Sequence, residues 1–157
     1  MNAVISECGN YRYVLTRSLG SILRWYKPCL FIMLNPSTAD ASIDDPTIRR
    51  CMAFAKREGR THLTVVNLFA LRATNPKELL ESNNPFGPDN DKHLREQLDK
   101  HKNDLIIAAW GSNKAVSMAE FPPLEQYDIY CLGKNANGTP KHPLYIKSDK
   151  ELELFKK

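Results

Sequence analysis

Three polar residues that lie far apart in the sequence have side chains suited to holding a neutral, planar ligand. Asn35 follows one apolar run, Asn67 lies near the end of another, and His142 lies in a loop rich in Gly, Pro and Asn. A carboxamide both donates and accepts hydrogen bonds, and so does a neutral imidazole. If the fold gathers these side chains in one crevice, a nucleobase is a ligand of the right chemistry.

Each of these residues also has a purely structural explanation. Asn35 precedes a proline and could serve only to shape the turn into the next segment. Asn67 could hydrogen-bond a neighbouring turn, and His142, beside Lys141, could be an ordinary surface histidine. Trp110, at the end of a third apolar run, fits the core better than it fits a stacking platform. A functional interpretation therefore depends on whether the elements that carry these residues converge.

Four short apolar runs predict strands that are buried on both faces of a sheet. They are residues 30–35, 63–69, 104–111 and 127–133. Because helical patterns separate them, the strands are expected to form βαβ units, and hence a parallel sheet with helices on both faces. The carboxyl ends of parallel strands lie on one edge, where open α/β sheets bind their ligands. The two asparagines and the loop with His142 should therefore share that edge.

Helix boundaries are marked most clearly after the first of these strands. Asp45 fits an N-cap, Pro46 fits the first helical position, and Gly59 fits the stop. Capping explains Asp45, and in part Asp44, without a catalytic pair of carboxylates. A capping box over residues 148–151 predicts a final helix. Further helices are expected over 91–101 and 112–119, with a short one from Asn75.

The N-terminal part of the chain predicts a hairpin. Residues 11–17 and 21–26 are rich in β-branched and aromatic residues and are separated by a turn at Gly20. Two such runs indicate antiparallel strands at the edge of the sheet.

Length and composition place the chain among ordinary globular proteins. It has 157 residues, of which 42% are hydrophobic and 25% charged, as expected for a single domain over residues 1–157. No apolar run approaches the length of a membrane span, so we expect no membrane partner and a cytoplasmic location. The net charge of +4 permits a polyanionic partner without requiring one.

Several common site chemistries have no counterpart in the sequence. It contains no G-x-G-x-x-G, no P-loop lysine and no G-x-S-x-G, and its four cysteines lack the spacing of metal ligands. We therefore expect neither a cofactor nor a metal.

Four short motifs, in order along the chain, resemble those of the uracil-DNA glycosylase superfamily. MLNPS at 33–37 resembles the first motif, most closely in the mismatch-specific uracil and thymine branch. LTVVN at 63–67 resembles the strand that presents a base-reading asparagine, IIAAWGS at 106–112 a later strand end, and HP at 142–143 the last motif. The whole chain also resembles a bacterial and phage domain family of unknown function, which is marked by MLNPSTAD, DDPTIRR, NLFALRAT and KHPLY.

The glycosylase resemblance implies a fold and an activity. The fold would be a three-layer αβα sandwich with a central four-stranded parallel sheet of order 2-1-3-4, preceded by the N-terminal hairpin. The activity would be hydrolysis of the N-glycosidic bond of a uracil-like or modified base that is flipped out of DNA. Asn35 would orient the attacking water, Asn67 would pair with the base, and His142 would donate a hydrogen bond to the leaving base.

The resemblance also suggests the surroundings of these residues. Pro36 and Ser37 would line the base pocket, and Phe69 or Phe54 would replace the stacking aromatic that is missing from residues 37–53. Single- or double-stranded DNA would contact Lys141, Leu144, Tyr145, Arg49 and Arg50. Two departures are that Ser37 stands where the superfamily motif has glycine, and Leu144 where it has serine. Acidic residues at 40, 44 and 45 are unfavourable beside a phosphate backbone.

Two other functions remain open. The first is a catalytically inactive module on the same fold, which binds DNA, a nucleotide or a protein partner. The second is an enzyme that acts on free nucleosides or nucleotides, in which the acidic loop 40–45 contacts a sugar or a metal-bound phosphate.

Overall fold

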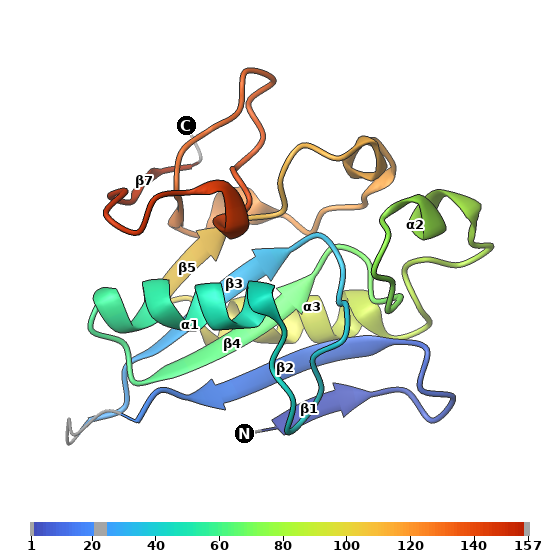
Figure 1. The fold of residues 1–157 in the computed structure, drawn as a ribbon, viewed down its shortest axis with the longest axis horizontal. Coiled ribbons are helices and arrows are strands. Elements are labelled where there is room, and N and C mark those ends of the chain that lie inside the picture. The colour runs from blue at the N-terminus through green and yellow to red at the C-terminus, as the bar shows by residue number, and fades with distance from the viewer. Residues whose placement is uncertain (1, 21–24, 156–157) are drawn as a thin grey trace.

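The computed structural model describes residues 2–20 and 25–155, which form a mixed sheet flanked by helices (Figure 1). Among these residues the strand order is β1-β2-β4-β3-β5-β6-β7. The strands are β1 (Asn2–Ile5), β2 (Arg12–Ser18), β3 (Pro28–Met33), β4 (His62–Asn67), β5 (Leu105–Ala108), β6 (Ile129–Cys131) and β7 (Glu153–Leu154). β3 pairs in parallel with β4 and β5, and β5 with β6, whereas β1, β2 and β7 pair antiparallel. The predicted α/β class is confirmed.

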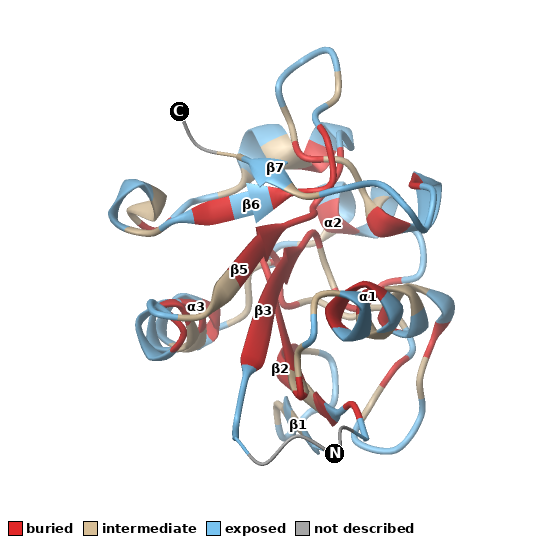
Figure 2. Cartoon of the chain, turned by 90° about the vertical axis from the view of Figure 1, so that its left-hand side faces the viewer, coloured by how far each residue is buried: buried red, intermediate tan, exposed pale blue. Residues whose placement is uncertain are grey.

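Helices cover both faces of the sheet. The α-helices are α1 (Pro46–Arg57), α2 (Lys77–Glu81) and α3 (Asn90–Lys100), and the 3-10 turns are η1 (Lys114–Met118), η2 (Leu124–Gln126) and η3 (Pro143–Tyr145). α1 and α3 lie on opposite sides of the central strands (Figure 2). β3, in the middle, is buried at every position. No helix in the described part of the chain has both the length and the apolar character needed to cross a membrane.

The start of α1 is as its sequence predicts. Asp45 is the N-cap, and its Oδ1 accepts the Ile48 N–H at 2.8 Å. Pro46 occupies the first turn, where its missing N–H costs nothing. Gly59 follows the helix with a φ of +73°, a conformation that glycine adopts without strain. The helix therefore begins at a defined point beside the carboxyl ends of the strands.

The predicted N-terminal hairpin is wrong in its pairing. β2 is antiparallel to β1, which precedes it, and to β4. Of the second strand expected over 21–26, residues 21–24 lie outside the described residues, while Trp25 and Tyr26 are exposed and lie in no strand. β2 thus lies inside the sheet, because residues 2–5 supply an edge strand that the sequence pattern did not reveal.

The predicted final helix is also wrong, because the residues of its capping box are bonded elsewhere. Ser148 Oγ accepts a hydrogen bond from Arg50, and the Ser148 carbonyl accepts one from Arg57. The chain then forms β7, which pairs with β6. The expected helix over 112–119 is the shorter 3-10 turn η1. Side chains of α1 therefore decide the conformation of the C-terminal segment.

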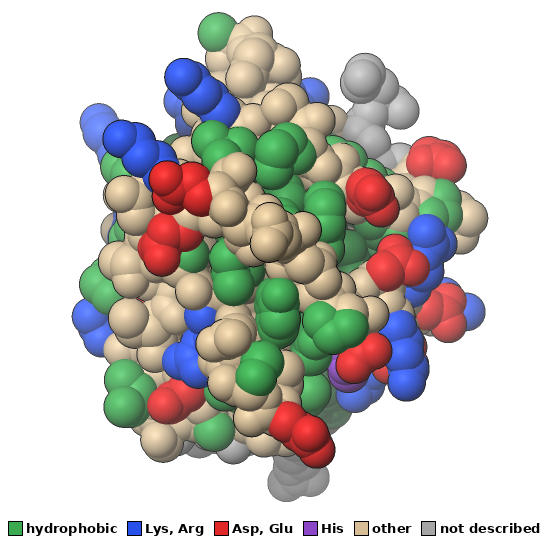
Figure 3. Space-filling view, turned by 90° about the vertical axis from the view of Figure 1, so that its right-hand side faces the viewer, with side chains coloured by type: hydrophobic (Ala, Val, Ile, Leu, Met, Phe, Trp, Pro, Cys, Tyr) green, Lys and Arg blue, Asp and Glu red, His purple; other side chains and the backbone are tan. Residues whose placement is uncertain are grey.

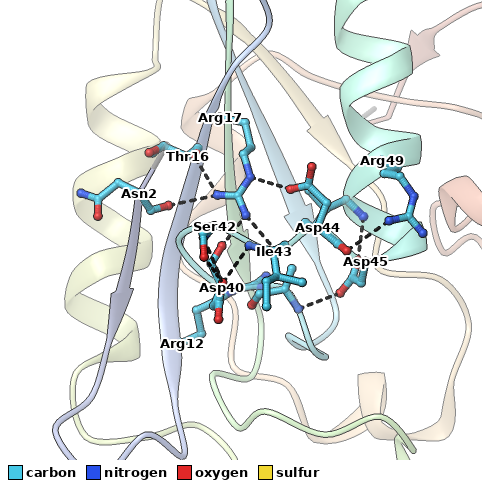
Figure 4. A network of polar contacts seen from close by, with 12 residues as sticks. Asn2, Arg12, Thr16, Arg17, Asp40, Ser42, Ile43, Asp44, Asp45 and Arg49 are labelled. Carbon is cyan, nitrogen blue, oxygen red and sulfur yellow. Dashed lines mark hydrogen bonds and ion pairs between the residues drawn. The ribbon is translucent and has the colours of Figure 1, made fainter.

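A buried arginine fixes the loop between β3 and α1 (Figure 4). The Arg17 guanidinium is 1% exposed, and its Nε lies 2.6 Å from Asp44 Oδ1. Its other nitrogens donate to the backbone carbonyls of Asn2, Thr16, Asp40 and Ile43. The Asp40 carboxylate instead accepts the N–H groups of Ser42 and Ile43 within the loop itself. Arg17 thus ties β2 to the loop that leads into α1.

Replacing Asp44 by alanine should destabilise the fold much more than replacing Asp40. Asp44→Ala leaves the buried Arg17 guanidinium without its counter-charge, which typically costs about 3 kcal/mol or more. Asp40→Ala removes only solvent-exposed hydrogen bonds within the loop, so its effect should be much smaller. The free energy of unfolding in urea measures both. Equal losses would contradict the role assigned to Arg17.

Candidate functional site

A cavity of about 620 Å³ lies at the carboxyl ends of the parallel strands. It contains Asn35 from the segment after β3, Asn67 from the end of β4, and His142 from the loop before η3. The first turn of α1 forms one wall, and Trp110 and Gly111 after β5 form another. The structure therefore brings together the three polar residues that the sequence singled out.

Asn67 is buried with no partner for its side chain. It is 1% exposed, and neither its Oδ1 nor its Nδ2 has a hydrogen-bond partner among the described residues. As the last residue of β4, it follows the alternation of Leu63 and Val65, which face α1. An unpaired buried amide typically costs about 1–3 kcal/mol. Because Asn67 lines the cavity, a ligand with its own donor and acceptor is the natural partner.

Asn35 is held in one orientation by its NH₂ group. Nδ2 donates to the carbonyls of Pro36 and Ala73, at 2.9 and 2.8 Å. Because both partners are acceptors, the amide nitrogen must face them and Oδ1 must point away. No described residue donates to Oδ1, so it can accept a hydrogen bond from a ligand or a water.

His142 is arranged as a neutral donor. Its Nδ1 accepts the Leu144 N–H at 3.2 Å, which leaves the proton of the neutral ring on Nε2. Burial lowers the pKa of His142, and Asp45 opposes this shift. Gly111 lies against it, since a Cβ on that glycine would be 3.4 Å from the His142 Cβ. The packing of this loop thus favours an imidazole with a donating Nε2–H.

Of the three other residues predicted to form the base pocket, one lines the cavity and two do not. Ser37 lines the cavity, whereas Pro36 is buried outside the lining and uses its carbonyl to hold Asn35 and Ala73. Phe69 does not reach the cavity: it is fully buried and stacks on Phe86 with ring centroids 5.0 Å apart. The expectation that Phe69 stacks on a base is therefore wrong. β4 ends at Asn67, so strand alternation no longer determines where Phe69 points.

Of the five residues predicted to contact DNA, two line the cavity and three do not. Leu144 and Tyr145 line the cavity and are 44% and 85% exposed, so they form an apolar rim. Arg49 is exposed and donates to the Asp44 carbonyl.

Arg50 and Lys141 lie outside the lining. Arg50 donates to the Pro143 and Ile146 carbonyls and to Ser148, so it anchors the C-terminal loop instead of facing solvent. Lys141 is half-buried, and its stem packs near Gly133. Of the residues assigned to DNA contact, the rim pair is the best placed for a ligand that enters the cavity.

The charges around the site are mixed. Figure 3 shows a face of the molecule with hydrophobic side chains in a band down its middle and most acidic and basic side chains to either side. Among the carboxylates of loop 40–45, only Asp45 lines the cavity, and both of its oxygens accept backbone N–H groups, from Ile48 and Ala39. No group of three His, Cys, Asp or Glu side chains in the described chain could hold a metal ion.

Sequence reasoning missed Arg12. This residue is 2% exposed and lines the cavity, where its Nε has no partner among the described residues. In the sequence it is one arginine in an apparently alternating strand, and no local pattern indicates which face it takes.

These features define an α/β protein with a cavity at the carboxyl edge of its parallel strands, lined by both apolar and polar residues. A family model described as "Protein of unknown function (DUF1643)" matches residues 12–144. The chain belongs to this family, in agreement with the whole-chain resemblance seen in the sequence. No curated protein and no solved structure matches the chain.

Replacing Asn67 by leucine should stabilise the fold. Asn67→Leu exchanges an unpaired buried amide for an apolar group of similar size, so the free energy of unfolding should rise by about 1 kcal/mol. Asn90→Leu is the matched control, because Asn90 Nδ2 donates to the Asn67 and Leu68 carbonyls and its loss should destabilise. Urea unfolding of both variants measures the contrast. A destabilised Asn67→Leu would indicate that this amide has a structural partner.

The depressed pKa of His142 should appear in the pH dependence of stability. The unfolded chain, with an ordinary histidine pKa of about 6.5, takes up the proton more readily than the folded chain. The contribution of His142 is therefore complete above pH about 6.5 and is lost as pH falls through the lower folded value. Between pH 7.5 and 5, wild type should lose more unfolding free energy than His142→Gln. Parallel curves would contradict the burial effect.

Proposed function

We propose that the protein is a uracil-DNA glycosylase-like hydrolase that removes a uracil-like or modified base from a nucleotide flipped out of DNA. The observation that carries this proposal is the buried, unpaired amide of Asn67 in a cavity that also contains Asn35 and His142. A pyrimidine edge with adjacent N–H and C=O groups would pair with both atoms of that amide.

The three groups suit the charge changes of glycosidic cleavage. As the C1′–N bond breaks, its electron pair leaves with the base, positive charge develops on the sugar, and a water oxygen bonds to C1′. A donor directed at a base oxygen stabilises the departing anion, and His142 Nε2–H offers one. Asn35 Oδ1 would hold the water in place. Because an amide cannot take the water's proton, which must pass to solvent, turnover should be slow.

The rim suits a base that is drawn out of a strand. Flipping costs unstacking energy, which an apolar side chain inserted between bases can offset. Leu144 and Tyr145 lie at the mouth of the cavity on η3, and Tyr145 is 85% exposed. Among the described residues, Arg12 is the only lysine or arginine that lines the cavity, so the site attracts a phosphate backbone only weakly, which favours single-stranded or already unpaired substrates.

The topology is consistent with the proposal. The parallel strands follow the order β4-β3-β5-β6, which is the 2-1-3-4 order expected of the superfamily. The first motif directly follows β3, and the second ends β4 with Asn67. We therefore propose a uracil-DNA glycosylase-like fold with three antiparallel strands added at its edges.

The main alternative is a module with the same pocket but no turnover. The structural reason to retain this alternative is Asn35, which can hold a water but cannot activate it. Such a protein would bind a flipped base, a nucleotide or a protein partner through the same cavity. The two functions predict different products from the same substrate.

The direct test is an oligonucleotide panel that carries uracil, hypoxanthine or hydroxymethyluracil, followed by alkaline strand cleavage. Wild type should release at least one base, and His142→Ala and Asn67→Ala should each slow release by about a hundred- to a thousand-fold. Asn35→Ala should also slow it. Asn137→Ala, at an exposed loop position, is the matched control and should keep the wild-type rate.

The other outcomes of the panel separate the alternatives. Binding without base release would favour the inactive module. Release from free nucleosides with no oligonucleotide affinity would favour an enzyme of free nucleosides. Complete inertness of wild type toward all of these substrates would end the glycosylase proposal.

A further inference from the structure

A β-bulge in β2 points Arg12 into the cavity. In the β1–β2 ladder Val4 pairs with Val14, but Ile5 pairs with Arg12, so Tyr13 is an extra residue. Tyr13 and Val14 consequently both pack on the α3 face of the sheet. Arg12 then returns to the α1 face, where it lines the cavity. Bulges often redirect a side chain in this way beside functional sites.

Arg12 and Arg17 lie on the same strand, but their bonding differs. Arg17 forms an ion pair with Asp44 and donates to four backbone carbonyls. Among the described residues, the Arg12 side chain donates from Nη1 to the Ala39 carbonyl at 2.9 Å, while its Nε is buried and has no partner. No carboxylate among the described residues lies within ion-pair distance of it. A buried guanidinium in this state is costly unless an anion reaches it.

The guanidinium stays charged in spite of its burial. Burial lowers the pKa of Arg12 to about 10, and Asp45 opposes that shift. At neutral pH the side chain therefore carries its positive charge into the cavity. Asp45 lies at the same corner, because its Oδ2 accepts the Ala39 N–H, but both of its oxygens are already bonded to backbone donors.

We infer that Arg12, with the nearby Thr38 and Thr47, forms an oxyanion subsite for the phosphate of a nucleotide whose base lies against Asn67. Both threonines line the cavity with Arg12 and bring hydroxyl donors. The volume of about 620 Å³ lies in the range that holds whole small molecules, and exceeds the needs of one pyrimidine ring. The nucleotide identity of the ligand rests on the proposed function, whereas the oxyanion subsite rests on Arg12 itself.

Wild type alone provides the first test. Calorimetry should show that deoxyuridine 5′-monophosphate binds about 10- to 100-fold more tightly than deoxyuridine, as charged hydrogen bonds to an arginine imply. The subsite would be overturned if deoxyuridine binds as tightly as its 5′-monophosphate and a trinucleotide with charged phosphodiester linkages shows no higher affinity either.

Substitutions of Arg12 test whether this residue causes the preference for the phosphorylated ligand. Arg12→Met should reduce the ratio of the deoxyuridine 5′-monophosphate affinity to the deoxyuridine affinity to about one, and Arg12→Lys should keep part of the preference. Arg72→Met is the matched control, because Arg72 is close enough to interact electrostatically with Arg12 but lies outside the cavity lining. A preference that survives in Arg12→Met, or falls equally in Arg72→Met, would overturn the inference. If Arg12→Met does not fold, Arg12→Lys decides: an unchanged preference overturns the subsite, and a partial loss supports it.

A separate experiment tests whether the bound phosphate belongs to a DNA phosphodiester or to a free nucleotide. A trinucleotide with central deoxyuridine is compared with one whose two linkages are neutral methylphosphonates. An Arg12-dependent preference for the charged trinucleotide indicates a DNA phosphodiester, and a preference confined to the free monophosphate indicates a nucleotide. Either result supports the subsite.

Failure of this inference can be told from failure of the proposed function. If no uracil ligand binds, the thermal unfolding midpoint is compared in inorganic phosphate and in chloride at equal ionic strength. A rise in phosphate for wild type but not for Arg12→Met supports the subsite without the base, and no rise overturns it. Deoxyuridine binding that depends on Asn67, without any Arg12-dependent preference, supports base recognition and overturns the subsite.

Discussion

The ion pair between Arg17 and Asp44 is the interaction on which the cavity depends. A guanidinium that is 1% exposed is tolerated only because a carboxylate and four backbone carbonyls surround it. Most of those partners belong to the loop after β3, so satisfying Arg17 also fixes that loop. The loop in turn provides the cap of α1 and one wall of the cavity. A charge buried in β2 thereby orders a site formed mainly by other elements.

The site stands out because two of its buried polar side chains, Asn67 and Arg12, have unpaired atoms and line the same cavity. The donors of Asn90 and Arg17 bond to backbone carbonyls or a carboxylate, whereas the Asn67 side chain and the Arg12 Nε have no partner among the described residues. Packed proteins rarely leave buried polar atoms unpaired, because each one costs stability. Other buried atoms of the described residues are also unpaired, such as Asn90 Oδ1 and His101 Nε2, but they lie outside the cavity lining, whereas Asn67 and Arg12 share it. That coincidence is the structural reason to place the candidate site here.

The chemistry available in the cavity is largely neutral. Two amides and an imidazole whose pKa is lowered by burial offer directed hydrogen bonds without net charge, and Arg12 adds one buried cation. Such a set discriminates by the pattern of donors and acceptors, and it retains its strength because water is partly excluded. The exposed pair Leu144 and Tyr145 restricts the entrance by shape. A ligand of the proposed kind would therefore be recognised by hydrogen-bond geometry more than by long-range attraction.

The sequence by itself determined four of the strands, the capped start of α1, and the placement of Asn35 and Asn67 at strand ends. These features follow from local patterns: apolar runs, a helix cap, and the rule that parallel strands end on one edge. The expected burial on both faces fails for β6, where Tyr130 is exposed.

The tertiary structure decided where individual side chains point once regular alternation ends. The bulge at Tyr13 turned Arg12 into the cavity, the end of β4 freed Phe69 to join the core, and Arg50 held residues 143–148 so that a strand formed in place of a helix. Each outcome depends on a contact with a residue distant in the chain, and a local sequence pattern does not identify that residue.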